Sequence, residues 1–529
     1  MSIKDSPIKE LSIAQLIERL EGGWQSVSSG LIQGLVQRWE ARLNTKVEIV
    51  EIKEDTENIL YFKADLSNIC LRGMGKVPCI VLGGVADLSN RVRDLYRKIA
   101  SPHHLPFVLT LTDAVYNQAI NVFPRDRSLI LSPDQVKGLL DHEEPYEHLK
   151  QLLWQQIPKR QLSAYNLLLP AEKSIFFGRH NELDRLREAE EVSFAIAGPG
   201  RMGKTSLVKR YREEMISRHD PRSSCRFYIN FYDCEDTTPN GVARFFAMAI
   251  SPSNLSARMT ADKLVNFLRH QSSSFGYPID LLLDEVDLIC QGNAFKSLAH
   301  AARLGLCRLV LCGRGVLLKT LLGSGSPIDC RLDLIKLEPL DEKSARTLIL
   351  RPLADLGFKL ADPAPLIDKV LRFTGRLPHL IQFSGQKLIE IALNEETDTI
   401  SLSHIDKLMA DFLTAQYFTK PLGEIMDTET QLAALLLLKE GVKEFTVQAA
   451  QEVLRRAGLD ISHHRMLEIC NDLVINNVLA WSNTSFRTVN EGLYYYAREM
   501  GYFNGALEEA MALATEFHGG AYETIPKLR

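Results

Sequence analysis

The sequence lacks the features that mark secreted, disulfide-rich, zinc-binding or membrane proteins. Its nine cysteines are scattered, odd in number and without a CxxC pair, a pattern that favours reduced, buried thiols over a disulfide framework or a zinc site. No run approaches the roughly 18–20 apolar residues of a membrane span. Met1–Pro7 contains no signal-peptide apolar stretch. We therefore expect a soluble, cytoplasmic protein.

Neither sign of charge dominates, and internal repeats and low-complexity segments are also missing. The 62 basic and 66 acidic residues leave a net charge of −4, which gives no global attraction to nucleic acid. Apolar residues make up 45% of the chain and charged residues 24%, as in ordinary globular proteins. At 529 residues the chain exceeds one hydrophobic core, so about two to four domains are expected.

One glycine-rich segment, Gly198–Thr205, carries the most specific signal in the chain. It reads GPGRMGKT and fits the pattern G-x-x-x-x-G-K-[ST]. The apolar run Val192–Ala197 before it predicts a buried strand, and Ser206–Arg212 after it predicts the first turns of a helix. In this context the glycines let the backbone approach a β-phosphate, and the free N–H groups of the helix start point at it. The segment therefore predicts a P-loop that binds ATP or ADP.

Individual side chains of this loop have predictable roles. Lys204 would reach the β- and γ-phosphates, and the Thr205 hydroxyl would bind Mg²⁺. The nucleotide-binding residues expected from the loop are Gly198, Gly200, Arg201, Met202, Gly203, Lys204, Thr205 and Ser206. A second glycine-rich stretch, Gly73–Lys76, is followed by Val77 and Pro78. No hydroxyl can hold a metal there and no helix can start, so we interpret it as a loop.

A second element of a phosphate site follows about 80 residues later. The apolar strand Ile279–Asp284 ends in two carboxylates. Asp284 would hold Mg²⁺, and Glu285 would polarise the water that attacks the γ-phosphate. Asp287 is interpreted as a helix cap. The strand Arg308–Cys312 is followed by Arg314, which is a γ-phosphate sensor in its own site, a finger into a neighbouring subunit, or a surface arginine.

Four segments share their pattern with one known group of proteins. They are Phe177-Gly-Arg-x-x-Glu182, Gly200–Leu207, Leu281–Glu285 and Thr374–Gln382. Together they resemble the STAND-type and related AAA+ P-loop ATPases of bacteria and archaea, well over about 173–400 and loosely over 421–500. The resemblance implies that Phe177, Gly178 and Arg179 pack on the adenine side of the nucleotide and that Pro378 touches the nucleotide.

The resemblance includes one departure. Many members of the group carry glycine where this chain has Arg376, which is either a second phosphate sensor or a residue facing solvent; the sensor is favoured. Leu337–Glu342 and Arg351-Pro352 resemble the hinge into a helical lid. What the resemblance implies is a slowly hydrolysing ATPase that acts as a conformational or oligomerisation switch in signalling or defence. In such a switch, phosphate contacts from Thr205, Arg314 and Arg376 would tie the core to the lid.

The predicted fold is α/β, with a P-loop NTPase core of the AAA+/STAND-like type, a helical lid, an N-terminal α/β domain and a C-terminal winged helix. The expected boundaries are an N-terminal α/β domain over 1–145, a linker over 146–172, the ATPase core over 173–335, the lid over 336–418, the winged-helix-like domain over 419–500 and a helical tail over 501–529.

The C-terminal part predicts three helices, within 428–439, 446–457 and 462–476, followed by a hairpin over 478–489. This order resembles a winged helix. Its third helix offers His463, His464 and Arg465 but also Glu468 and Asp472, whereas a phosphate-tracking surface should be positive. A protein-contact or autoinhibitory wing is therefore favoured over DNA binding. The paired histidines are interpreted as an exposed helix start, not as metal ligands.

The N-terminal part is the least informative. Its strands alternate with helices, which favours a parallel-sheet unit, and we expect it to sense a signal or dock a partner. Glu51-Ile-Lys53 matches the E-x-K of restriction-type nucleases, but an amphipathic strand explains it equally and is favoured. Asp87, Asp113 and Asp134 follow strand ends, where α/β units place ligand sites, but an interpretation as ordinary helix caps and turns is favoured.

Two further functions remain open at this point. One is an ATP-dependent DNA-binding loader, or a regulator of transposition or replication, that uses the winged helix. The other, with less support, is an ATP-regulated effector enzyme with its active site in residues 1–145. A protein partner or self-assembly is expected, DNA is not favoured, and no membrane partner is expected.

Overall fold

The computed structural model describes residues 29–53, 59–82, 96–97, 105–189, 191–217, 224–253, 256–322, 332–423, 425, 427–441, 444–476, 478–482 and 484–498. It divides into two compact units. The first comprises Met1–Phe176, Thr347–Ala361 and Gly385–Ser401, and the second comprises Phe177–Arg346, Asp362–Ser384 and Leu402–Arg529. The expected helices over 11–20, 90–99 and 501–529, and Asp87, lie wholly or largely outside the described residues.

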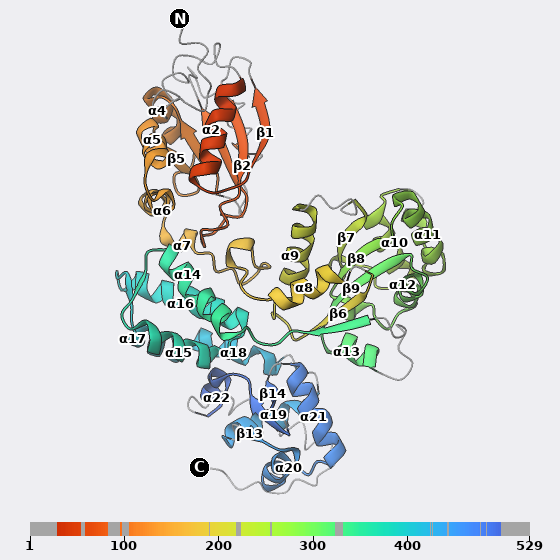
Figure 1. The fold of residues 1–529 in the computed structure, drawn as a ribbon. Helices are drawn as coiled ribbons and strands as arrows, with labels where there is room; N and C mark the ends of the chain where they lie inside the picture. Colours follow the sequence, from red (N-terminus) through yellow and green to blue (C-terminus); the bar gives the residue numbers. More distant parts are fainter. Residues whose placement is uncertain are drawn as a thin grey trace, which may run out of the picture. The chain divides into compact units, whose positions relative to one another are not determined.

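The first unit is built on a five-stranded sheet in the order β1-β2-β3-β4-β5. Strand β2 runs antiparallel to β1 and β3, whereas β3, β4 and β5 are parallel. The parallel pairing expected from alternating strands and helices is therefore present among β3, β4 and β5, whereas β2 departs from it. The β1–β2 connection contains too few residues for the helical crossover that a parallel pair requires. The elements of the unit (Figure 1) are α2 (Ser29–Arg42), β1 (Val47–Lys53), β2 (Ile59–Ala64), β3 (Val77–Leu82), β4 (Phe107–Thr110), α4 (Asp113–Val122), β5 (Leu129–Leu131), α5 (Pro133–Asp141), α6 (Pro145–Gln156) and α7 (Lys159–Leu162).

Asp355 is a buried hub of the first unit. Its carboxylate accepts hydrogen bonds from Lys150 Nζ at 3.1 Å and from the Cys70 backbone N–H at 2.8 Å. Its backbone carbonyl accepts another from Trp154 Nε1 at 3.1 Å. Because an isolated buried carboxylate is costly, these partners fix α6 and the loop before β3 against the end of α14 (Glu342–Asp355).

Tyr165 supplies a hydrogen bond that a proline removes from the same helix. Pro352 lies inside α14 and has no N–H to donate to the carbonyl of Leu348. The buried Tyr165 hydroxyl donates to the carbonyls of Leu348, at 3.2 Å, and Ile349, at 3.0 Å. Gly385 leaves room for this ring, because a Cβ there would lie 2.3 Å from Tyr165 Cζ. The segment expected to be a linker is thus packed onto helices of its own unit.

The second unit contains a parallel five-stranded sheet in the order β10-β6-β9-β8-β7. Its strands are β6 (Ser193–Ala197), β7 (Arg226–Asn230), β8 (Ile279–Asp284), β9 (Cys307–Gly313) and β10 (Leu332–Lys336). Strands β8 and β9 are buried along their whole length, as expected of a sheet covered on both faces. The helices around it (Figure 1) are α8 (His180–Glu188), α9 (Lys204–Ser217), α10 (Pro239–Ile250), α11 (Leu264–Phe275), α12 (Asn293–Arg303) and α13 (Gly315–Leu322).

Helices follow the sheet. They are α14, α15 (Pro363–Thr374), α16 (Pro378–Asn394), α17 (Leu402–Ala410) and α18 (Phe412–Gly423), with a small parallel pair formed by β11 (Lys359–Leu360) and β12 (Thr399–Ile400). Helices α14 and α16 contribute residues to both compact units.

The C-terminal part of the second unit contains the three expected helices, α19 (Thr428–Lys439), α20 (Val447–Arg456) and α21 (His463–Ile475). The expected hairpin is also present, as β14 (Leu479–Ser482) and β15 (Ser485–Thr488). A short strand, β13 (Glu444–Phe445), pairs with β15, and α22 (Glu491–Arg498) closes the part. These elements enclose a core of buried leucines, together with Phe445 and Phe486. The two-residue strand β13 was missed because so short a segment has no readable period.

Candidate nucleotide site

The P-loop lies between β6 and α9, at the carboxyl edge of the parallel sheet. Lys204 is the first residue of α9, and its Nζ donates to the carbonyls of Gly198, at 2.8 Å, and Pro199, at 2.7 Å. Burial lowers the pKa of Lys204 below its ordinary value. Gly203 has φ +92°, a conformation that favours glycine. The loop is thus folded around its own lysine, at the positive end of a fourteen-residue helix.

The Thr205 hydroxyl and the Asp284 carboxylate meet beside this loop. Thr205 Oγ1 donates to Asp284 Oδ2 at 2.6 Å, and the Tyr228 hydroxyl donates to the same oxygen at 2.9 Å. Asp284 is only 1% exposed. Burial, together with the Asp284 charge, raises the pKa of Tyr228, so its proton stays in place to hold the carboxylate. The in-register parallel strands bring Asn230 of β7 opposite Asp284 of β8.

Glu285 and Arg314 lie at the same edge. Arg314 Nε is 3.9 Å from Glu285 Oε2, and a Cβ on Gly200 would lie 3.6 Å from the Arg314 guanidinium carbon. Glu285 has φ +54°, a conformation uncommon for a residue with a side chain and often found at functional positions. The fold therefore brings Glu285, Arg314 and the P-loop together within one chain.

Asp287 is a helix cap, as interpreted from the sequence, but for a helix later in the chain. Its carboxylate accepts hydrogen bonds from the backbone N–H groups of Arg314, at 2.5 Å, and Leu317, at 2.9 Å. These groups start α13, whose first N–H groups have no partner within the helix. Asp287 thereby fixes the backbone that carries Arg314.

The segment before α8 touches the P-loop through Arg179. This side chain donates to Glu182 Oε1 at 3.1 Å, to the Met202 carbonyl at 3.4 Å and to the Glu338 carbonyl at 2.6 Å. Burial lowers the pKa of Arg179, against the opposing effect of Glu182. Arg179 thus joins the P-loop to Glu338, in the segment after β10, through protein contacts. Its neighbour Gly178 has φ +76°, and a Cβ there would lie 2.7 Å from Ser344 Oγ.

The remaining expected binding residues differ in how closely they are held. Phe177 is partly buried, whereas Met202 and Ser206 are buried. Arg201 is exposed and has φ +63°. Its guanidinium lies over the Tyr417 ring of α18, 5.2 Å from the centroid, and Tyr417 stacks on Phe383 at 4.1 Å. This is a cation–π contact between the P-loop and the helices after the sheet.

Pro378 and Arg376 belong to the turn between α15 and α16. Pro378 is the first residue of α16, and Arg376 has φ +59°. Arg376 lines a cavity of ≈ 670 Å³ whose lining, among the described residues, contains none of the P-loop. A separate small cavity, of ≈ 70 Å³, brings Pro199, Gly200 and Arg201 together with His379. Leu377 of this turn and His379 at the start of α16 therefore line a cavity together with the P-loop.

His379 and Tyr228 were missed by the sequence reasoning. Burial, and next to it the Arg201 charge, lowers the pKa of His379 to about 3. The sequence signals were weak: His379 directly follows the proline of the quoted motif, and Tyr228 lies near the carboxyl end of a strand. Neither residue type is diagnostic of a phosphate site. Tyr228 is identified only by the order of the strands, and His379 only by the cavity that α16 shares with the P-loop.

Asp113, Asp134 and the stretch Gly73–Lys76 were also singled out from the sequence. Asp113 and Asp134 lie in the first turns of α4 and α5, whose N-caps are Thr112 and Ser132, so the two aspartates themselves are not the caps. The stretch Gly73–Lys76 is a loop that leads into β3.

Within the described residues, neither the E-x-K pattern nor the paired histidines belong to a metal-binding group. Glu51 and Lys53 lie on the edge strand β1, opposite Tyr61 and Ile59. His463 begins α21. Among the described residues, no group of three or more His, Cys, Asp or Glu side chains could hold a metal ion. The eight cysteines in that part of the chain are all free and buried.

A parallel sheet in this strand order, a P-loop between β6 and α9 and an acidic end on β8 define a P-loop NTPase core. No protein-family model matches the sequence. A search of curated proteins also finds no match. Within the described residues, no helix is long and apolar enough to cross a membrane.

Solved structures with a partial likeness exist. They include the Walker-type ATPase PABY2304 of Pyrococcus abyssi (TM-score 0.47, 15% identity, 61% of this chain and 96% of that chain). The Aeropyrum pernix ORC2 protein in ADPNP and ADP complexes gives a TM-score of 0.43 at 14% identity, with 63% and 95% covered. The Thermotoga maritima RuvB Holliday junction branch migration motor gives 0.34 at 12%, with 63% and 98% covered. With scores this low, these similarities establish neither the activity nor the partners of this chain.

Proposed function

We propose that this protein binds ATP and hydrolyses it slowly, and that the nucleotide acts as a conformational switch. The 2.6 Å hydrogen bond between Thr205 Oγ1 and Asp284 Oδ2, beside Lys204 at the start of α9, carries the proposal. The hydroxyl and the carboxylate are the two oxygen donors that a P-loop site offers to Mg²⁺. No further carboxylate is needed, because Mg²⁺ in such sites keeps phosphate oxygens and waters as its remaining ligands.

In this proposal each side chain has one task. Lys204 would exchange its two carbonyl partners for phosphate oxygens, and the N–H groups at the start of α9 would hold the β-phosphate. Mg²⁺, when bound, would neutralise charge on the phosphates. Glu285 would accept a proton from the attacking water, and Arg314, now 3.9 Å from that carboxylate, would turn to the γ-phosphate.

The switch is supported by contacts that the P-loop makes beyond the sheet. Arg179 connects the Met202 carbonyl to that of Glu338, and Arg201 lies over Tyr417. A loop that reshapes around a triphosphate would change both contacts, because the P-loop supplies the Met202 carbonyl to one and the Arg201 side chain to the other. We propose that this links nucleotide state to the position of the lid and the C-terminal part.

The first test separates binding from hydrolysis. We expect Lys204→Ala to abolish ATP binding, because the ammonium that meets the phosphates is removed. We expect Glu285→Gln to keep ATP binding while turnover falls by about 10²–10⁴-fold, because the base is lost and the cradle is not. Binding is measured by calorimetry and turnover by phosphate release.

Matched controls are available in the same unit. Lys296→Ala on α12 and Glu213→Gln on α9 change exposed residues and should leave both quantities unaltered. If Glu285→Gln hydrolyses ATP at the normal rate, Glu285 is not the general base. If Lys204→Ala still binds ATP, the proposed nucleotide site is wrong.

For the C-terminal part we propose a winged helix that contacts protein. Arg465, the arginine at the start of its third helix, is ion-paired to Asp427, to Glu429 at 2.7 Å and to Glu468 at 3.1 Å. A side chain neutralised by three carboxylates is a poor contact for DNA phosphates. The DNA-loader alternative therefore has less support; it would require salt-sensitive, ATP-dependent binding to duplex DNA.

We also propose that the first unit docks a partner or a second copy. The effector-enzyme alternative has less support, because among the described residues no group of three or more His, Cys, Asp or Glu side chains could hold the metal of a nuclease-type site. ATP-dependent oligomer formation by the Glu285→Gln variant, measured by light scattering, would support the switch.

A further inference from the structure

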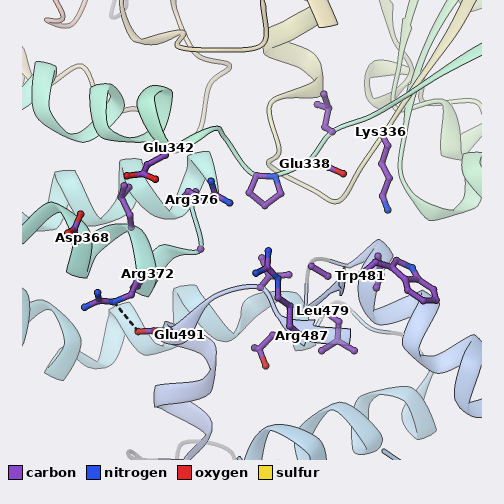
Figure 2. Close-up of a pocket in the computed structure, with 18 of the residues that line it drawn as sticks. Lys336, Glu338, Glu342, Asp368, Arg372, Arg376, Leu479, Trp481, Arg487 and Glu491 are labelled. Carbon is purple, nitrogen blue, oxygen red and sulfur yellow. Dashed lines mark ion pairs between the residues drawn. The ribbon is translucent and has the colours of Figure 1, made fainter. Parts of the chain in front are cut away.

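The cavity that Arg376 lines is formed by three segments of the second unit. The residues after β10 form one wall, the end of α15 and the turn after it form the second, and the hairpin β14–β15 forms the third. Figure 2 shows Arg376 on the lid side and Arg487 on the hairpin side, with Lys336 and Trp481 to their right. The volume of the cavity, ≈ 670 Å³, is in the range of small-molecule sites.

Backbone contacts hold these walls together. The Leu340 N–H donates to the Arg376 carbonyl at 3.1 Å. A Cβ on Gly375 would lie 2.3 Å from the Val489 carbonyl oxygen, so only glycine allows the turn to approach the hairpin this closely. Arg376 follows in a left-handed conformation, with φ +59°. A strained non-glycine residue at a cavity wall is typical of a functional position.

Most charges on the walls are already compensated. Arg346 is paired with Glu342, at 2.9 Å, and with Asp368. Arg372 is 3.8 Å from Glu491 (the dashed line in Figure 2).

Three cations of the cavity remain. Within the described part of the chain, Lys336, Arg376 and Arg487 form no ion pair. The only acidic lining residue outside those pairs is Glu338. The cavity is therefore net positive and presents two guanidinium groups, the side chains suited to binding phosphate through two hydrogen bonds at once.

Trp481 adds a planar surface to the same cavity. Its ring packs against buried Phe486, with centroids 4.2 Å apart, and 46% of the residue stays exposed. An exposed tryptophan supported from behind by another ring is suited to stacking on a planar aromatic ligand. Cations and an aromatic ring on neighbouring walls match a phosphate and a base carried by one molecule.

We propose that this cavity is a second ligand site, separate from the P-loop, which binds a small nucleotide. Arg376, Arg487 and Lys336 bind its phosphate, and Trp481 stacks on its base. A ligand held by all three walls would fix the hairpin against the lid turn, so its presence would bias the same lid that the P-loop contacts. The site does not depend on the proposed ATPase activity.

AMP is the probe, and the Lys204→Ala protein is the background, because that substitution removes binding at the P-loop. AMP titrated into this protein should quench tryptophan fluorescence, and the quench should disappear when Trp481→Phe is added. Arg487→Gln should weaken AMP binding about tenfold or more, since it removes a charged hydrogen-bond donor. Ribose 5-phosphate, which has no base, should bind at least about tenfold more weakly than AMP.

The control is Arg455→Gln on α20. Arg455 pairs with Glu452 at 2.7 Å and does not line the cavity, so its AMP affinity should equal that of the Lys204→Ala background. The proposal is overturned if millimolar AMP does not bind, if Arg487→Gln binds AMP unchanged, or if AMP and ribose 5-phosphate bind equally. Binding of a single-stranded oligonucleotide without binding of AMP would also overturn it. ATP binding by the wild-type protein separately tests the P-loop.

Discussion

Asp284 shows how much one residue can be read from a sequence and where that reading stops. Its place at the end of an apolar strand predicted a phosphate-site carboxylate, and the structure brings it within 2.6 Å of Thr205 Oγ1. Its second donor, Tyr228, could not be predicted, because β7 lies next to β8 only in the folded sheet. Residue type and local context predict the members of a loop, whereas partners from other strands require the topology.

His379 gives a prediction that belongs to a single residue. Its pKa is lowered to about 3, against an ordinary value near 6.5. Below pH 6.5 the unfolded chain therefore binds a proton that the folded chain does not. The free energy of unfolding should fall as the pH drops from 6.5 towards 3 and should not depend on this group above pH 6.5.

Replacement of His379 measures that contribution. His379→Gln should reduce the pH slope of the unfolding free energy between pH 6 and 5 by up to about 1.4 kcal/mol per pH unit. Urea unfolding at several pH values gives the slope. His270→Gln, at an exposed position on α11, should keep the wild-type slope. An unchanged slope in His379→Gln would show that the imidazole is protonated in the folded protein.

At the scale of elements, the strands of the second unit were predictable from the sequence, but the contacts between them were not. Their apolar runs were predictable, and the P-loop strand, the acidic strand and the strand before Arg314 appear where the sequence indicated. The charged residues near the starts of three of these strands could not be assigned a role from the sequence. Register places Arg226, Asp280 and Arg308 side by side on β7, β8 and β9. Arg226 Nε is 2.5 Å from Asp280, and Arg308 is 3.4 Å from it.

This buried cluster yields a stability prediction. Asp280→Asn removes the carboxylate that pairs with both the Arg226 and the Arg308 guanidinium groups, whose side chains are 2% and 6% exposed. We expect a loss of about 3–5 kcal/mol in the free energy of unfolding, because the variant breaks a buried ion pair by removing one partner. Chemical denaturation measures it.

The matched control is Asp333→Asn. Asp333 pairs with Arg185 where both side chains are about half exposed, at 49% and 43%, so its loss should cost about 0–1 kcal/mol. Equal losses in the two variants would mean that the buried carboxylate contributes no more than a surface one.

The same limit explains the first unit. Alternating strands and helices correctly indicated an α/β arrangement, but strand direction was wrong for β2 because direction follows from connections and not from apolar period. Tyr165 and Asp355 are equally silent in the sequence. Their importance depends on contacts between residues about 200 positions apart, which one sequence without its fold cannot reveal.

At the scale of the whole molecule, the contact between Arg201 and Tyr417 should regulate nucleotide exchange. Tyr417→Leu removes a cation–π interaction of about 0.5–2 kcal/mol. If the contact keeps the lid over the site, release of a fluorescent ADP analogue should accelerate about 2- to 30-fold. Stopped-flow fluorescence measures the rate.

Tyr277→Leu serves as the control. Tyr277 is 40% exposed and precedes β8 at the amino end of the sheet, so it should leave ADP release unaltered. Release from Tyr417→Leu at the wild-type rate would mean that this contact does not restrain the nucleotide.

The two hydrogen bonds from Lys204 to Gly198 and Pro199 have a consequence for selectivity. An ammonium group already satisfied by carbonyls gives them up only for a stronger acceptor, and a phosphate oxygen is one. A nucleoside without phosphates offers no such exchange. Adenosine should therefore not bind, whatever contacts its base could make. Every ligand that does bind loses part of its binding free energy to the rearrangement of the loop.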